Sequence, residues 1–151
     1  MTQEDKELLL KDLCARLPYG VKCQIDYDNE EDTDLGIERY RDDRIVSVCT
    51  ETEEIGLYEE SVYSPPEYVK PYLFPLSSIT KEQREELKQE HIKDEKLYVE
   101  CLTRAAKGDN SMRGKVIIHY AMDWCNANHF DYRGLIEDGL AIDATGLNIY
   151  E

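Results

Sequence analysis

The spacing of apolar residues near the N-terminus predicts an amphipathic helix over residues 3–16. Thr2 and Asp5 form a capping-box pattern in front of it, and Pro18 with Gly20 marks its end. The apolar stripe comprises Leu9, Leu10, Leu13, Cys14 and Leu17, with Lys6, Glu7, Lys11 and Asp12 assigned to the polar side.

The next segment has the alternating pattern of a half-buried β-strand. Apolar and polar residues alternate from Val21 to Asp28. Turn-forming residues then separate short runs with strand-like composition, which is typical of an antiparallel meander. We expect a turn at 29–34, a second strand at 35–41, a turn at 42–43, a third strand at 45–52 and a fourth at 55–58.

The centre of the chain is rich in tyrosines and prolines and has no clear period. Pro65, Pro66, Pro71 and Pro75 exclude a long helix, because each lacks an amide donor and restricts the residue before it. We interpret this region as a connection that crosses the molecule.

Helical patterns return in the second half of the chain. Thr80 and Gln83 give a second N-cap signal, for a helix with a charged first half and an apolar stripe that begins at Leu97. A further helix is expected over 115–126, and residues 129–136 indicate a short capped helical turn.

Together these elements predict an α+β fold in a single globular domain over residues 1–151. An N-terminal helix precedes a three- to four-stranded antiparallel meander, and two to three helices then pack on one face of the sheet. A chain of 151 residues with 41% hydrophobic residues has enough apolar material for one core.

Charge narrows the classes of partner. The chain has 33 acidic and 18 basic side chains and a formal net charge of −15. Nucleic acid and anionic membrane surfaces are bound by clustered Lys and Arg, so we expect no direct contact with either. Residues 26–67 hold fifteen acidic side chains against three arginines, a net charge of −12, so the meander is the acidic face.

Tyrosines share this part of the chain. Seven of the eleven lie between Tyr19 and Tyr72, and tyrosine is enriched in protein interfaces. We therefore expect the acidic, tyrosine-bearing surface to bind a protein partner. The candidate residues are Asp26, Asp28, Glu30, Glu31, Asp32, Asp34, Tyr40 and Tyr58.

The acidic run allows two other interpretations. Its carboxylates could imitate the phosphates of nucleic acid and occupy a basic groove, as an inhibitor encoded by a phage would. A calcium loop is disfavoured, because the sixth and twelfth positions counted from Asp26 are Glu31 and Ile37 instead of the required Gly and Glu.

Polar side chains late in the chain offer an alternative site for a small enzyme or metal protein. We favour a structural corner at 129–133, in which Arg133 pairs with a carboxylate, over a catalytic or metal site. Nucleotide-binding and hydrolase motifs are absent, and we expect no cofactor, no metal and no catalytic activity. The candidates are His119, Asp123, His129, Asp131, Tyr132 and Arg133.

Cysteine usage and the N-terminus bear on the compartment. Five cysteines at irregular spacing, without a C-x-x-C pair, indicate reduced thiols. Cys14, Cys23, Cys101 and Cys125 occupy apolar positions and are expected to act as small hydrophobic residues. No export signal or membrane span is recognised, so we expect a cytoplasmic protein.

Three stretches of the sequence carry a resemblance to other proteins. They read LLLKDLCARLPYGV at 8–21, KPYL and PLSS at 70–73 and 75–78, and DWCNANHFDYRGLIE at 123–137 followed by GLA at 139–141. They resemble a family of short uncharacterised proteins from gut bacteria and their phages. The resemblance implies a bacterial or phage-related origin and brings no activity or site residue with it.

Overall fold

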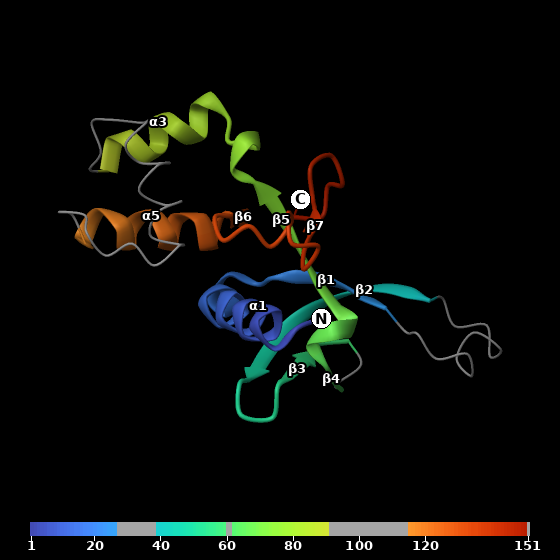
Figure 1. Cartoon of the computed structure of the whole chain (residues 1–151). Coiled ribbons are helices and arrows are strands. Elements are labelled where there is room, and N and C mark those ends of the chain that lie inside the picture. The colour runs from blue at the N-terminus through green and yellow to red at the C-terminus, as the bar shows by residue number, and fades with distance from the viewer. Residues whose placement is uncertain (27–38, 60–61, 91–114, 151) are drawn as a thin grey trace.

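A mixed β-sheet with helices around it makes up the described part of the chain (Figure 1). The computed structural model describes residues 1–26, 39–59, 62–90 and 115–150. The strands are β1 (Lys22–Asp26), β2 (Tyr40–Cys49), β3 (Glu54–Leu57), β4 (Tyr63–Ser64), β5 (Val69–Pro75), β6 (Phe130–Asp131) and β7 (Ile142–Asp143). The helices are α1 (Gln3–Arg16), α3 (Lys81–Glu90) and α5 (Lys115–Ala127), with 3-10 turns η1 (Leu17–Tyr19), η2 (Pro66–Tyr68) and η3 (Leu76–Ser78).

The strands follow the order β4-β3-β2-β1-β5-β6, and β7 also pairs with β5. Strands β1, β2, β3 and β4 pair antiparallel in succession. Strand β1 also pairs antiparallel with β5. Both β6 and β7 run parallel to β5. The predicted α+β class is confirmed, whereas the sheet is mixed and not purely antiparallel.

The turn expected at Asp42 and Asp43 is wrong, because β2 runs through both residues. Asp42 lies opposite Gln24 and Asp43 opposite Cys23 in the ladder with β1. The Asp43 carboxylate accepts bonds from the amides of Arg44 (2.6 Å) and Glu59 (3.1 and 3.2 Å). These bonds satisfy a buried acid inside a strand, which turn propensity could not foresee.

The proline-rich connection contains a strand that the sequence did not predict. Pro71 lies in β5 opposite Cys23 of β1, although it brings no amide donor to the ladder. Val69, Tyr72 and Leu73 of this strand are buried. The expected fourth strand is confirmed as β3. Three other predictions lie outside the described residues: the turn at 29–34, the start of the second strand and the apolar stripe from Leu97.

Apolar packing falls into two clusters. Leu9 and Leu13 of α1 pack with Ile25, Ile45 and Leu73 of the sheet. The second cluster forms around Ile79, Cys125 and Phe130 at the end of β5. Figure 1 accordingly shows α3 and α5 on the far side of β5 and β6 from the β1–β4 strands.

Helix α1 has the predicted bounds but a different buried face. The capping box is present, with Asp5 N–H donating to Thr2 Oγ1 (3.2 Å) and Thr2 N–H to Asp5 Oδ2 (2.8 Å). Cys14 is exposed, so its expected role in the core is wrong, whereas Cys23 and Cys125 are buried as expected. Asp12, which the sequence pattern assigns to the polar side, is fully buried. Arg16, which the pattern leaves unassigned, is fully buried as well.

A buried ion pair explains this shifted face. Arg16 Nε and Nη2 donate to the two carboxylate oxygens of Asp12 at 2.6 and 3.1 Å. Arg16 also donates to the carbonyls of Phe130 (2.9 Å) and Cys125 (3.4 Å), and Arg133 Nε donates to Asp12 Oδ1 (3.0 Å). Burial by itself would lower the pKa of Arg16, but the Asp12 carboxylate more than offsets it and the pKa lies above its usual value. The cluster ties α1 to the end of α5 and to β6.

Arg16→Met is expected to lower the free energy of unfolding by about 3 to 5 kcal/mol, because it removes one member of a buried ion pair and two carbonyl partners. Lys11→Met, at an exposed position of the same helix, is the matched control and should change it by no more than about 0.5 kcal/mol. Urea denaturation followed by circular dichroism measures both. An Arg16→Met protein within about 1 kcal/mol of the wild type would contradict the assigned role of the cluster.

Candidate functional site

Three of the predicted partner-binding residues lie in the described part of the chain. Asp26 ends β1 opposite Tyr40 at the start of β2, and Tyr58 follows β3. Asp28, Glu30, Glu31, Asp32 and Asp34 lie outside the described residues.

Tyr40 and Tyr58 belong to the sheet face that α1 does not cover. Ile45 and Leu57 point into the core shared with α1, so Arg44 and Tyr58, their chain neighbours, point to the opposite side. There the Arg44 guanidinium lies 4.2 Å from the centre of the Tyr58 ring. The exposed fractions of Tyr40 and Tyr58 are 49% and 57%.

Tyr63 of β4 extends this surface. It is 65% exposed and pairs with Gly56 of β3. A side chain at Gly56 would collide with the Ser47 hydroxyl and lie 3.3 Å from the Tyr63 ring, so the glycine leaves room for that ring to lie over the backbone. We call Tyr40, Arg44, Tyr58 and Tyr63 the tyrosine face.

Two of the described carboxylates beside the tyrosine face, those of Asp26 and Asp42, are bonded within the protein. Arg39 donates to both oxygens of Asp26, at 2.9 and 3.2 Å. The Tyr72 hydroxyl donates to Asp42 Oδ1 at 2.6 Å, and burial together with Asp42 raises the pKa of Tyr72 above its usual value. Neither carboxylate is therefore an unpaired anion of the kind that phosphate mimicry needs.

The structure divides the second set of candidates into two groups. His119 and Asp123 are exposed on α5, whereas His129, Asp131 and Tyr132 are buried and Arg133 is half-buried at the end of that helix. Within the described ranges, no three His, Cys, Asp or Glu side chains come together in a way that could hold a metal.

Asp131 and Arg133 serve the fold. The Asp131 carboxylate accepts the amides of Arg133, Gly134, Leu135 and Ile136 at 2.8 to 3.2 Å. Residues 130–131 form β6, so the helical turn expected at 129–136 is instead a short strand followed by turns that this carboxylate caps. Arg133 pairs with Asp12 and not with Asp131, and its Nη2 donates to the Tyr132 hydroxyl at 2.8 Å.

His129 differs from its neighbours. Its backbone is left-handed, with a φ of 58°, and its ring stacks on Tyr150 with the two centres 3.8 Å apart. Its Nδ1 is buried and has no hydrogen-bond partner. Burial and the positive charge of Arg16 lower the pKa of His129 to about 4, so the imidazole is neutral near pH 7.

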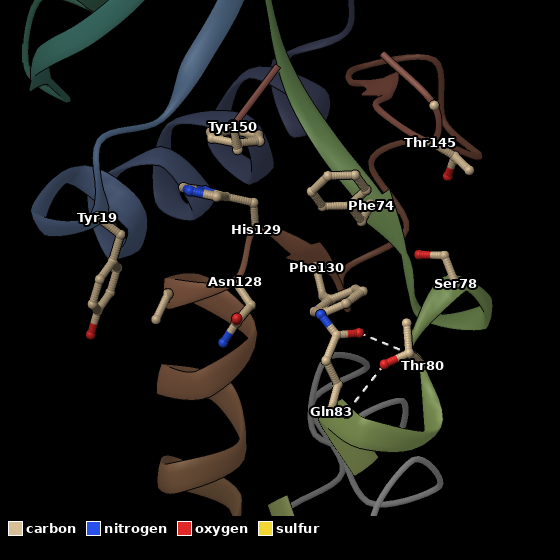
Figure 2. A pocket seen from close by; sticks show the side chains of 12 residues that line it. Tyr19, Phe74, Ser78, Thr80, Gln83, Asn128, His129, Phe130, Thr145 and Tyr150 are labelled. Atoms are coloured by element: carbon tan, nitrogen blue, oxygen red, sulfur yellow. Dashed lines mark hydrogen bonds between the residues drawn. The ribbon is translucent and has the colours of Figure 1, made fainter. Parts of the chain in front are cut away.

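His129 lines a cavity of about 590 Å³ at the junction of β5, η3, α3, α5, β6 and the C-terminal segment (Figure 2). Among the described residues that line it, none is charged. Phe74, Phe130 and Tyr150 supply aromatic walls, and Thr80, Gln83 and Asn128 supply polar groups.

Sequence reasoning missed several residues of this region. Asp12 and Arg16 have the spacing of an ordinary surface pair on a helix, which gave no sign of burial. Phe74 and Tyr150 lie 76 positions apart in the chain, and their rings come within 6.0 Å only through the fold. In the sequence, His129 was the one residue that pointed to a site in this region.

The buried thiols are poor nucleophiles. Burial raises the pKa values of Cys23 and Cys125 to about 12, so neither is a thiolate near pH 7. This argues against a cysteine-based reaction at these two positions.

Comparisons with protein-family models, curated protein sequences and solved structures find no match. The resemblance to proteins of gut bacteria and their phages therefore stays a prediction. Among the described residues, no helix combines the length and apolar character needed to cross a bilayer.

We expect His129 to titrate near pH 4 in an NMR experiment on the folded protein, where burial disfavours the charged ring. In the unfolded chain, histidine binds a proton near pH 6.5. As the pH falls from about 6.5 to about 4, His129 therefore lowers the free energy of unfolding progressively, and above this range it leaves that free energy unchanged.

The matched variant is His129→Asn, because asparagine tolerates a left-handed backbone. Its free energy of unfolding should depend less steeply on pH between 4 and 6.5 than that of the wild type. A His129 midpoint near 6.5, or an unchanged slope in the variant, would refute the buried neutral state.

Proposed function

We propose that this protein is an interaction module that binds a protein partner through the tyrosine face and performs no catalysis of its own. The observation that carries the proposal is a sheet face with three tyrosines, each 49 to 65% exposed, on which the Arg44 guanidinium already stacks on Tyr58. Tyr and Arg, together with Trp, are the residues most enriched among the energetic centres of protein interfaces.

The arrangement suits binding for a second reason. An antiparallel sheet that faces water usually presents polar side chains, yet this one presents aromatic rings. Tyrosine offers a large contact area and loses little conformational freedom when it is bound. The Arg44–Tyr58 stack restricts both side chains before a partner arrives, which reduces the entropy lost on binding.

Charge indicates the kind of partner. The chain carries a net charge of −15, most of it in residues 26–67, which include β2, β3 and β4. Glu51, Glu59 and Glu67 are exposed in this part of the chain. A partner with a basic rim around an apolar centre would be attracted by this field and would bury the tyrosines.

The other two functions have weaker support. A nucleic-acid mimic needs unpaired carboxylates, and Asp26 and Asp42 are bonded to Arg39 and Tyr72. Among the candidate residues of an enzyme at 119–133, Asp131 is engaged in capping and Arg133 in an ion pair with Asp12.

The first step of the test identifies a partner at the tyrosine face. A photoreactive benzoylphenylalanine replaces Tyr63 in the full chain, and proteins cross-linked in host cells are isolated and identified by mass spectrometry. The same substitution at Tyr19, an exposed tyrosine of η1, is the control. A protein joined at position 63 and not at position 19 is then purified.

Calorimetry with that purified protein decides the proposal. The double variant Tyr58→Ser with Tyr63→Ser should bind at least about tenfold more weakly, and Tyr19→Ser within about twofold of the wild type. Affinity should also fall as salt rises. Equal binding by all three chains, or no protein joined at position 63, would overturn the proposal. A partner displaced by DNA and indifferent to the two tyrosines would favour mimicry instead.

A further inference from the structure

The cavity beside His129 has aromatic walls from three distant segments. The Phe74 ring of β5 lies 6.0 Å from the Phe130 ring of β6 and 6.0 Å from the Tyr150 ring near the C-terminus, tilted to each by just over 50°. Trp124 stacks on one face of Phe130 and His129 on one face of Tyr150, so a further planar group would use the ring surface that these contacts leave at the cavity. A volume of about 590 Å³ is in the range of small-molecule sites.

Polar groups lie on both sides of these rings. Figure 2 shows Ser78, Thr80 and Gln83 on one side of Phe130, and His129 with Asn128 on the other. Thr80 and Gln83 bond to each other through the helix cap, which fixes their side chains at the cavity wall. Several convergent polar groups in an otherwise aromatic cavity are typical of a site that orients one ligand.

His129 is held at the wall at a conformational cost. It is 7% exposed, has a positive φ, and leaves Nδ1 buried without a partner. Trp124 Nε1 and Asn126 Oδ1 are also buried and unpartnered, so the three such side-chain atoms among the described residues fall within six positions of the chain. Buried polar atoms without partners are rare in folded proteins, and of these three side chains only His129 lines the cavity.

The lining determines which ligands fit. The described residues around the cavity include neither a cation nor an anion, so a charged ligand would be desolvated without a counter-charge. Aromatic walls favour a planar ring, and the imidazole and amide groups favour one with N–H or C=O functions.

We propose that this cavity binds a small, uncharged, planar heteroaromatic molecule, stacked against Phe130 or Tyr150 and hydrogen-bonded by His129. The site is at the opposite end of β5 from the strands that carry the tyrosine face. Ligand binding is therefore testable independently of any protein partner.

The test uses nicotinamide and adenine as uncharged probes and nicotinate as the charged counterpart of nicotinamide. Each is titrated into the full-length protein and followed by protein NMR. Either uncharged probe should shift the resonances of Asn128, His129 and Thr145 saturably, with a Kd of about 1 mM or lower. Nicotinate should bind at least about tenfold more weakly than nicotinamide, because its carboxylate has no counter-charge.

Two variants assign the binding to the cavity. Ala127→Trp places a large ring at an exposed position of the cavity wall, and Glu7→Trp adds the same ring to an exposed position of α1 as its control. Ala127→Trp and His129→Asn should each weaken binding at least about tenfold, and Glu7→Trp should leave it unchanged. Native-like spectra of each variant show that the fold is kept.

Three results would overturn the proposal. They are the absence of saturable shifts with both uncharged probes, equal affinity for nicotinate and nicotinamide, and binding that survives Ala127→Trp and His129→Asn unchanged.

Discussion

A buried ion pair between Asp12 and Arg16 joins helix α1 to the C-terminal half of the chain. Taking both charges out of water costs several kcal/mol each, and the hydrogen bonds from Arg16 to Asp12, Cys125 and Phe130 offset this cost. Arg16 reaches two carbonyls of the C-terminal half, and Arg133 shares the Asp12 carboxylate. The cluster therefore links helix α1 to the C-terminal half of the chain, in addition to pairing two residues within one helix.

That link positions the candidate ligand cavity. Arg16 holds the carbonyl of Phe130, and the neighbouring carbonyl of His129 accepts the amide of Phe74 at 2.9 Å. The α1 helix thus fixes β6 against β5, and with it the ring pair that walls the cavity. The positive charge of Arg16 also helps to keep His129 neutral. Arg16 therefore contributes both to the position of β6 and, together with burial, to the neutral state of His129.

The tyrosine face is built by other means. Its strands depend on the alternation of buried and exposed residues and on Gly56, which allows the Tyr63 ring to lie close to the backbone. They also depend on Asp43 of β2, whose carboxylate accepts the amide of Glu59, the residue after Tyr58. The aromatic side chains point away from the core that α1 shares with the sheet. Because the two regions rest on different contacts, the two proposed binding sites can be tested separately.

Local patterns in the sequence determined the elements whose stabilising contacts are themselves local: α1 with its capping box, β1 with its alternation, the cap at Thr80, and α5. The tertiary structure alone decided that Asp12 is buried, that Asp42 and Asp43 lie within a strand, and that a proline-rich segment becomes β5. Each of these depends on partners that the chain brings from elsewhere, such as the Phe130 carbonyl for Arg16 or the Glu59 amide for Asp43. Composition indicated an acidic, tyrosine-rich surface and a histidine corner, but the pairing of the acids and the cavity beside His129 follow from distances that no periodicity encodes.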